Sequence, residues 1–210
     1  KTSFPHWNMD KIKITFLGTG NAIPTKTRNH TGILLSFANE NILVDCGEGI
    51  QRQFRYADLS PAKITRILIT HWHGDHILGL LGLLQTLAML GYQRTLKIYG
   101  PRGTKKYFSI LSNFMAFYNR FNKYKIEIHE VSNQVFVNES NFFIETKPLE
   151  HGIPANSYAI VLKDRIRLNK AKLKKLKLPN SPLLGQLQKG KDVILNKKKI
   201  RAKSVTYAEK

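Results

Sequence analysis

Short apolar runs separated by turn residues dominate most of the chain. Residues 12–17 alternate apolar side chains with lysine and threonine and end in Gly18-Thr19-Gly20, a pattern that predicts a strand entering a turn. Two further runs, over residues 31–37 and 41–44, are predicted to form a β-hairpin. The same pattern predicts additional strands over residues 64–70, 96–99, 125–129, 142–146 and 157–162.

Two longer apolar stretches predict helices. Residues 77–90 are apolar over a length that favours a buried helix, and Gly91 is well placed to end it. A second helix is expected over residues 104–118. Because helices are interspersed among many short strands, we predict an α/β fold in which helices pack outside sheets.

The composition excludes several classes of protein. With 210 residues, 42% hydrophobic and 10% aromatic, the chain is expected to be globular and not disordered. No apolar run reaches the length of about 18 residues that a membrane-spanning helix needs, and the first residues lack the apolar segment of a secretory signal. The single cysteine, Cys46, excludes a disulfide framework and indicates a reducing compartment, so we predict a cytoplasmic protein.

Positive charge is concentrated toward the C-terminal end. The formal net charge is +20, and residues 163–210 hold 16 of the 34 lysines and arginines against 3 of the 14 acidic residues. Such a density indicates a polyanionic partner, most commonly nucleic acid, although a solvated lysine-rich surface would give the same composition. The apolar residues of this stretch are mostly spaced leucines that would form one side of a short helix, namely Leu168, Leu173, Leu176 and Leu178. We therefore interpret it as a protruding arm and not as more core.

The segment THWHGDH, residues 70–76, holds three of the seven histidines of the chain. His71 and His73 follow a predicted strand two positions apart, so in extended backbone they would point to one side and reach one cation. Asp75 and His76 follow directly and could face a second cation. Imidazole and carboxylate ligands together suit a borderline metal such as zinc.

A third ligand for the first cation is expected from another loop. His151, shortly after the strand predicted over residues 142–146, is the best candidate. His129 is expected to be an ordinary exposed residue within a strand. His6 and His30 are weaker candidates because each lies away from a predicted strand end.

Several motifs together resemble those of a known superfamily. The H-x-H-x-D-H segment, FLGTG over residues 16–20 and DCGEG over residues 45–49 resemble the metallo-β-lactamase superfamily. Within it, the chain is similar to the ribonuclease Z family, endonucleases that remove the 3′ trailer of precursor tRNA. The sequence PTKTRN over residues 24–29 matches the family's P-x-K-x-R-N loop, which is placed near the tRNA 3′ end, and VDCGEGIQRQ matches its form of the early aspartate motif. The basic stretch matches in position its tRNA-gripping exosite, with Ser181-Pro182 where a Gly-Pro pair is usual.

The resemblance implies a fold and a division of the chain. The fold would be the metallo-β-lactamase αβ/βα sandwich, largely its first half, with a protruding basic arm. Residues 9–162 would form the core and residues 163–203 the flexible basic arm. Residues 204–210 would return toward the other half of the sandwich, and residues 1–8 would be an extension or a tag.

The resemblance also implies a cofactor and roles for individual residues. Two zinc ions would be bound, with His71, His73 and His151 for the first and Asp75 and His76 for the second. Asp75 would also orient or deprotonate the nucleophile, and Asp45 would support the ligand loops from behind. From the residues alone, Asp45 could instead be a turn aspartate before Gly47. Cys46 is expected to be a small buried residue and not a ligand.

Precursor tRNA is the implied partner, and a homodimer is the implied assembly. The residues that would bind the RNA are Pro24, Lys26, Arg28, Asn29, Lys170, Lys172, Lys174, Lys175 and Lys177. As bare sequence, an ordinary surface loop would explain Lys26 and Arg28 equally well.

One part of the family's pattern is absent from the sequence. The family has a G-D-T strand end whose aspartate bridges both metals, and later histidines, whereas this sequence has no G-D-T and no histidine after His151. We expect a longer polypeptide or a separate chain to supply them, and we expect these residues alone not to be a competent enzyme. Two alternatives stay open, a metallo-β-lactamase-fold hydrolase of a small phosphodiester or thioester and a non-catalytic RNA-binding fragment or subunit.

Overall fold

The chain divides into two compact units. The first comprises residues 1–136 and 145–159, and the second comprises residues 137–144 and 160–210. The computed structural model describes residues 11–114, 124–176, 178, 180–195 and 198–209. No helix within these ranges combines the length and the apolarity needed to cross a bilayer.

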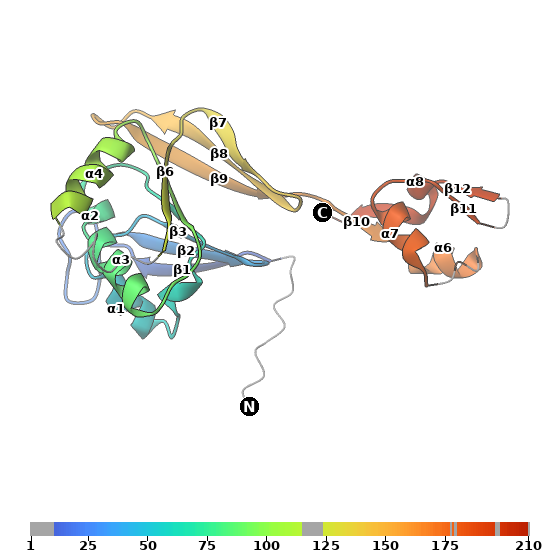
Figure 1. The fold of residues 1–210 in the computed structure, drawn as a ribbon, viewed down its shortest axis with the longest axis horizontal. Helices are drawn as coiled ribbons and strands as arrows, with labels where there is room; N and C mark the ends of the chain where they lie inside the picture. The colour runs from blue at the N-terminus through green and yellow to red at the C-terminus, as the bar shows by residue number, and fades with distance from the viewer. Residues whose placement is uncertain (1–10, 115–123, 177, 179, 196–197, 210) are drawn as a thin grey trace. The chain divides into compact units, whose positions relative to one another are not determined.

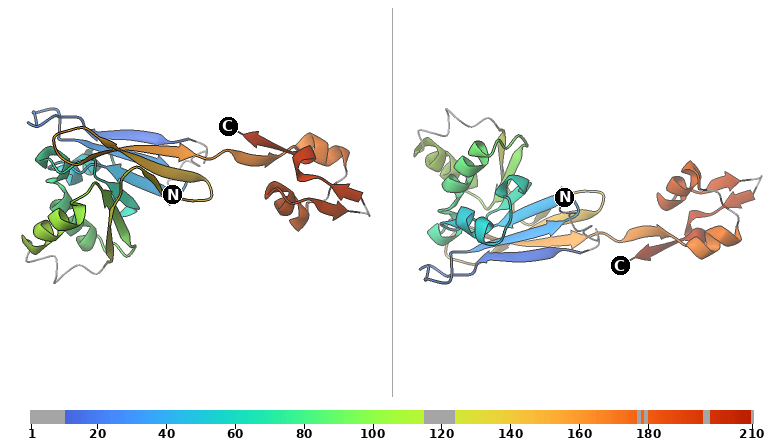
Figure 2. Two further views of the ribbon diagram at one scale, coloured as in Figure 1. Left: turned by 90° about the horizontal axis from the view of Figure 1, so that it is seen from above. Right: turned by 90° about the horizontal axis from the view of Figure 1, so that it is seen from below.

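A six-stranded sheet forms the centre of the first unit (Figure 1), with its strands in chain order. The strands are β1 Lys13–Gly18, β2 Gly32–Phe37, β3 Glu40–Val44, β4 Arg66–Leu68, β5 Leu96–Gly100 and β6 Ile126–Glu130. The first three are antiparallel and run side by side in both views of Figure 2, whereas β3 to β6 are parallel. The predicted hairpin is confirmed as β2 and β3. Because the carboxyl ends of parallel strands share one edge, the segments that follow β3 and β4 leave the sheet together.

Helices cover one face of this sheet with an apolar core. They are α1 Ile50–Tyr56, the 3-10 turn η1 Pro61–Lys63, α2 Gly74–Ile77, α3 Leu80–Met89 and α4 Thr104–Phe114. Leu34 and Leu43 of the sheet pack with Phe54 of α1 and Leu83 of α3, and none of the four is more than 3% exposed. The burial of one such side chain stabilises the fold by about 1.5–3 kcal/mol.

The helix predicted over residues 77–90 is present but divided around Leu78 and Gly79 into α2 and α3. The amide of Gly79 donates to the carbonyl of Cys46, and a Cβ at Gly79 would lie 2.0 Å from the carbonyl oxygen of Gly47. This close approach brings the segment after β3 onto the start of the helix. Gly91 follows the helix with a φ of 70°, as expected of a stop residue. The helix predicted over residues 104–118 is confirmed as far as residue 114, and residues 115–118 lie outside the described ranges.

A second sheet has the strand order β7-β8-β9. Its strands are β7 Gln134–Asn138, β8 Phe142–Leu149 and β9 Ala155–Leu162. The second and third were predicted, although β8 is longer than expected. Strand β7 was not predicted, because its apolar run is only three residues long, from Val135 to Val137. His151 lies in the connection between β8 and β9.

The second unit has a small apolar cluster of its own. Its buried members are Leu187, Val193, Ile200, Ala202 and Val205. Three of the four spaced leucines pack against them, whereas Leu176 is 48% exposed. The elements are β10 Arg165–Leu168, α6 Lys170–Lys175, α7 Pro182–Gln188, β11 Val193–Leu195, β12 Lys198–Ile200, α8 Ala202–Val205 and β13 Thr206–Glu209. The basic stretch therefore folds around a core that its sequence did not lead us to expect, while its role as an arm stays a prediction.

Candidate metal centre

Three histidines from two distant segments converge in the first unit. One ligand nitrogen from each of His71, His73 and His151 lies within 4.8 Å of the others. The ring centroid of His71 is 4.7 Å from that of His73 and 4.4 Å from that of His151. His71 is buried, while His73 and His151 are exposed, so the set is closed on one side and open on the other. Three imidazoles with an open position are the ligand set of a catalytic zinc site, so these residues fit that metal.

The backbone after β4 explains how two of these histidines meet. His73, which precedes α2, has an extended backbone with a φ of −74° and a ψ of 151°. In extended backbone, residues two apart point to the same side. A bridge between His71 and Ala155 ties this segment to the start of β9, which brings the connection carrying His151 beside it.

The environment of His71 keeps its imidazole neutral. Burial, followed by the charges of His76 and His151, lowers the pKa of His71 to about 4. A metal binds the neutral form of imidazole. Near neutral pH, His71 therefore does not need to lose a proton before it binds a metal ion.

Asp75 and His76 form a second pair of ligand atoms beside the three histidines. Asp75 Oδ2 lies 3.4 Å from His76 Nε2, and the ring centroids of His71 and His76 are 4.0 Å apart. Burial alone would raise the pKa of Asp75, but the amide of Ala22, which donates to Oδ2 at 3.1 Å, and the charge of His76 lower it. The carboxylate is therefore ionised near neutral pH.

Asp45 links His76 to the segment that carries His71. Its Oδ2 lies 2.7 Å from His76 Nδ1, and its Oδ1 accepts a 2.8 Å hydrogen bond from the amide of Thr70. The hydroxyl of Thr70 lies within hydrogen-bond distance of Asp45 and of His71 Nδ1. Burial would lower the pKa of His76, but the hydrogen bond and charge of Asp45 raise it. A carboxylate beside Nδ1 favours a proton on that nitrogen, so Nε2, which faces Asp75, is the atom that would bind a metal once the ring is neutral.

Backbone geometry after β3 places Asp45 in this position. Asp45 has a φ of 59°, in the left-handed region that residues other than glycine rarely adopt and that clusters at functional sites. A Cβ at Gly47 would lie 2.6 Å from the carbonyl oxygen of Asp75, so only glycine allows the two loops to come this close. Cys46 between them is fully buried, as expected, and burial followed by the charge of Asp45 raises the pKa of its thiol.

The loop over residues 24–29 is tied to the same site. The backbone of Ala22 reaches Asp75, and the side chain of Asn29 donates to the carbonyl of Glu48 at 2.7 Å. Pro24, Lys26 and Arg28 are exposed. The structure therefore presents three of the four expected RNA-binding residues to solvent and uses the amide of Asn29 to hold the loop.

The other histidines lie outside the converging set. His30 is 4% exposed, and its Nε2 lies 3.2 Å from the carbonyl oxygen of Ala22. The ring of His129 stacks on that of Tyr99 at 4.9 Å and is partly exposed, as expected. His6 lies outside the described residues.

The lysines predicted to grip RNA lie in the second unit. Lys170, Lys172, Lys174 and Lys175 are on α6 and all are exposed, while Lys177 lies outside the described residues. Asn169 caps this helix by accepting a hydrogen bond from the amide of Lys172. The first four lysines are thus free to meet a polyanion.

Thr70 and Tyr158 support the site, and neither was predicted from the sequence. The hydroxyl of Tyr158 donates to the carbonyl of Ile69 at 2.7 Å, just before the histidine segment. Burial raises its pKa above the ordinary value for tyrosine, so this hydroxyl stays a donor. An aromatic residue within an apolar strand carries no signal that separates this role from simple packing.

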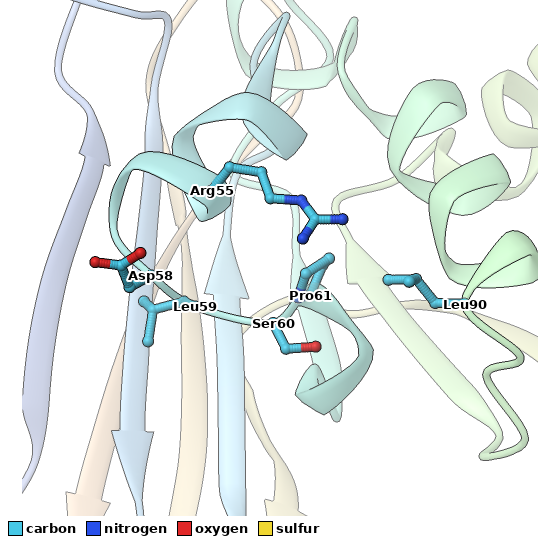
Figure 3. A pocket seen from close by; sticks show the side chains of 6 residues that line it. All are labelled: Arg55, Asp58, Leu59, Ser60, Pro61 and Leu90. Carbon is cyan, nitrogen blue, oxygen red and sulfur yellow. The ribbon is translucent and has the colours of Figure 1, made fainter.

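A hollow of about 300 Å³ lies elsewhere in the first unit (Figure 3) and is lined by Arg55, Asp58, Leu59, Ser60, Pro61 and Leu90. The side chains of Arg55 and Asp58 point apart in this view. None of the converging histidines lines this hollow, so it does not belong to the candidate metal centre.

Comparison with known proteins extends this picture. A family model described as Anti-Pycsar protein Apyc1 matches residues 12–195. The chain is 43% identical over 187 residues to Ribonuclease Z of Methanocaldococcus jannaschii, covering 87% of this chain and 57% of that protein. It is 42% identical over 204 residues to Ribonuclease Z of Methanococcus maripaludis, covering 95% of this chain and 65% of that protein. The chain thus spans about three fifths of the length of these relatives.

Solved structures confirm the predicted fold class. Human tRNase Z, short form, superposes with a TM-score of 0.64 and 30% identity, covering 71% of this chain and 64% of that one. The metallo-β-lactamase fold protein YhfI of Bacillus subtilis superposes with a TM-score of 0.58 and 23% identity, covering 71% of this chain and 58% of that one. The second match supports the fold alone.

Proposed function

We infer the function from one premise, that this chain belongs to the family described as Anti-Pycsar protein Apyc1 and has the metallo-β-lactamase fold, with relatives named Ribonuclease Z. We propose that it carries the metal-binding part of a zinc-dependent endoribonuclease. That enzyme would remove the 3′ trailer of precursor tRNA and leave a 3′-hydroxyl on the tRNA.

One observation carries this proposal: His71, His73 and His151 converge next to an ionised Asp75. Zinc held by these histidines would act as a Lewis acid on the scissile phosphate and on a nearby water. Asp75 would accept the proton of the attacking water, because its carboxylate is ionised and fixed by the amide of Ala22. His76, oriented by Asp45, would complete the protein's share of a second zinc site.

The charges around the site support RNA as the substrate. Lys26 and Arg28 are exposed on the loop that follows Ala22, whose amide donates to Asp75, so they would neutralise phosphates near the acceptor end. The exposed lysines of α6 would contact the tRNA body. A small-molecule hydrolase needs neither feature. We also propose a cytoplasmic homodimer, on the resemblance to ribonuclease Z.

The remaining ligands of two zinc ions would come from a longer polypeptide or from a separate chain. The sequence contains no histidine after His151, and its relatives are longer than the matched part. Activity is therefore best tested in a chimera in which residues 12–210 replace the matching region of the Methanococcus maripaludis relative.

The chimera should cleave precursor tRNA at the 3′ end of the mature tRNA and should lose activity with EDTA. Asp75→Ala should lower the rate by several orders of magnitude, while Asp58→Ala, a change at an exposed aspartate, should leave it unchanged. Cleavage of a small phosphodiester without cleavage of precursor tRNA would favour the small-molecule alternative. Tight tRNA binding without hydrolysis of either substrate would favour a non-catalytic RNA-binding subunit.

A further inference from the structure

A cavity of about 230 Å³ opens beside His73 and is not explained by metal binding. It is lined by Trp72, His73, Arg102, Tyr107, Ile153 and Pro154. Ile153 and Pro154 belong to the same connection as His151, and Arg102 and Tyr107 lie just before and within α4. The cavity therefore shares one wall with the candidate metal centre and has aromatic side chains on another.

The aromatic wall is held rigidly. The indole nitrogen of Trp72 donates to the hydroxyl of the buried Thr104 at 2.8 Å, and that hydroxyl donates to the carbonyl of Pro101. The rings of Trp72 and Tyr107 lie 5.4 Å apart between centroids at an angle of 38°. A Cβ at Gly103 would lie 3.0 Å from the ring of Tyr107, so the backbone itself backs this ring. Tyr107 remains 44% exposed and offers a fixed aromatic face.

The chemistry of the wall suits a nucleotide. Aromatic faces stack on bases of any sequence, and a guanidinium pairs with phosphate or stacks on a base. Arg102 is exposed at the cavity, whereas the amides of Gly103 and Lys105 at the start of α4 donate to Glu130 and are not available to an anion. The volume lies below the roughly 300–1,000 Å³ of pockets for drug-sized ligands, so it suits a single base and not a dinucleotide.

The position of the cavity indicates which nucleotide it would take. Ala22, two residues before the loop over residues 24–29, meets the site at Asp75, whereas the cavity meets it at His73 and includes no residue of that loop. A phosphodiester at the metal centre has one nucleotide on each side. If the loop holds the tRNA 3′ end, the nucleotide after the cleaved bond extends toward the cavity.

We propose that this cavity binds the base of the first trailer nucleotide, stacked on Tyr107 with Arg102 near its phosphate. The inference rests on the proposed function for the identity of the nucleotide, but its chemistry can be tested without any cleavage. Hydrolysis that leaves a 3′-hydroxyl on the tRNA gives a trailer with a 5′-phosphate, so nucleoside 5′-monophosphates are suitable probes.

Trp72 can report binding by its fluorescence. The chain has two tryptophans, so Trp7→Phe leaves Trp72 as the single emitter. Uridine 5′-monophosphate and adenosine 5′-monophosphate should quench this emission, with or without zinc, whereas ribose 5-phosphate should bind more weakly by about 5- to 150-fold, the range expected for loss of one base stack. Tyr107→Ala should cause a loss in the same range for both nucleotides, and Tyr107→Phe should restore most of it.

Tyr207→Ala is the matched control, because Tyr207 is 48% exposed and lies in the second unit. Equal affinity for uridine 5′-monophosphate and ribose 5-phosphate would overturn the proposal, and so would equal effects of the two alanine variants. Circular dichroism of Tyr107→Ala checks that the variant is folded.

The chimera separates this inference from the proposed function. An abasic first trailer nucleotide should slow its cleavage of precursor tRNA, and Tyr107→Ala should remove the difference between abasic and normal substrates. If the nucleotides bind as expected but precursor tRNA is not cleaved, the proposed function fails and the cavity remains a nucleotide site. If precursor tRNA is cleaved with no sensitivity to the trailer base, the cavity proposal fails alone.

Discussion

Replacing Asp45 by asparagine should disable the second pair of ligands without disturbing the first set. Asparagine keeps an oxygen that can accept from Thr70, but it places an amide donor where the carboxylate faced His76 Nδ1, which lies 2.7 Å away. Two donors repel, so His76 is expected to move its proton to Nε2, the atom that faces Asp75. Asparagine also tolerates the left-handed φ of 59° at this position, so backbone strain should change little.

The size of the effect follows from the hydrogen bond that asparagine cannot make with His76. A hydrogen bond to a charged group contributes about 1.5–3 kcal/mol. At about 1.4 kcal/mol per tenfold, this corresponds to about 10- to 140-fold in zinc affinity at Asp75 and His76. The range agrees with the 10–100-fold typical of residues that orient metal ligands. Isothermal titration calorimetry of the chimera with zinc measures this affinity directly.

The same change has a pH dependence with a definite sign. Asp45 raises the folded-state pKa of His76 above its unfolded value, so the pair stabilises the metal-free fold below the unfolded pKa of about 6.5 and the stability disappears as pH rises through the folded pKa. Urea unfolding of the metal-free chain should therefore show a larger cost for Asp45→Asn at pH 5 than at pH 8.

A matched control is available in Asp58→Asn. Asp58 also has a positive φ, of 53°, but it is exposed and lies outside the candidate site. This variant should change neither zinc affinity nor the pH dependence of unfolding. An NMR-measured pKa of His76 that is the same in wild type and Asp45→Asn would refute the role of Asp45, and so would an equal loss of zinc affinity in both variants.

Three further predictions test other parts of the molecule. Elemental analysis of the isolated chain should find fewer than two tightly held zinc ions, and His151→Ala should abolish tight binding; two ions per chain would show that further ligands exist. Replacing the five arm lysines by glutamine should weaken tRNA binding. The slope of log affinity against log salt concentration should fall by about 0.7–0.9 for each phosphate that is no longer neutralised. Five such substitutions of exposed lysines in the first unit should have a smaller effect. The substituted residues are Lys170, Lys172, Lys174, Lys175 and Lys177. Gly79→Ala should lower the urea midpoint strongly because its Cβ would meet Gly47, whereas Gly185→Ala, in α7 with open space around it, should raise stability by about 0.5–1 kcal/mol; equal effects would contradict the packing of Gly79.

Local patterns predicted much of the fold and the convergence of the candidate metal ligands. The strands of the six-stranded sheet are short apolar runs bounded by turn residues, and the close spacing of His71 and His73 after a strand was enough to place them together. The break at Gly79 could not be predicted, because it depends on the carbonyl of Gly47, which belongs to a segment far away in the sequence. The cavity beside His73 was missed for the same reason, since Trp72 and Tyr107 meet only after α4 folds back. The core of the second unit was hidden by the lysines between its leucines.

The convergence of His73 and His151 makes the metal a potential crosslink of the fold. These residues are 78 positions apart in the sequence, and their nitrogens meet within 4.8 Å. A single ion between them would close a long loop, which a disulfide does in other proteins but cannot do in a chain with one cysteine. At free zinc 100-fold above its Kd, such linkage would add about 2.7 kcal/mol to the free energy of unfolding. Metal supply would then set the stability of the fold as well as the proposed chemistry.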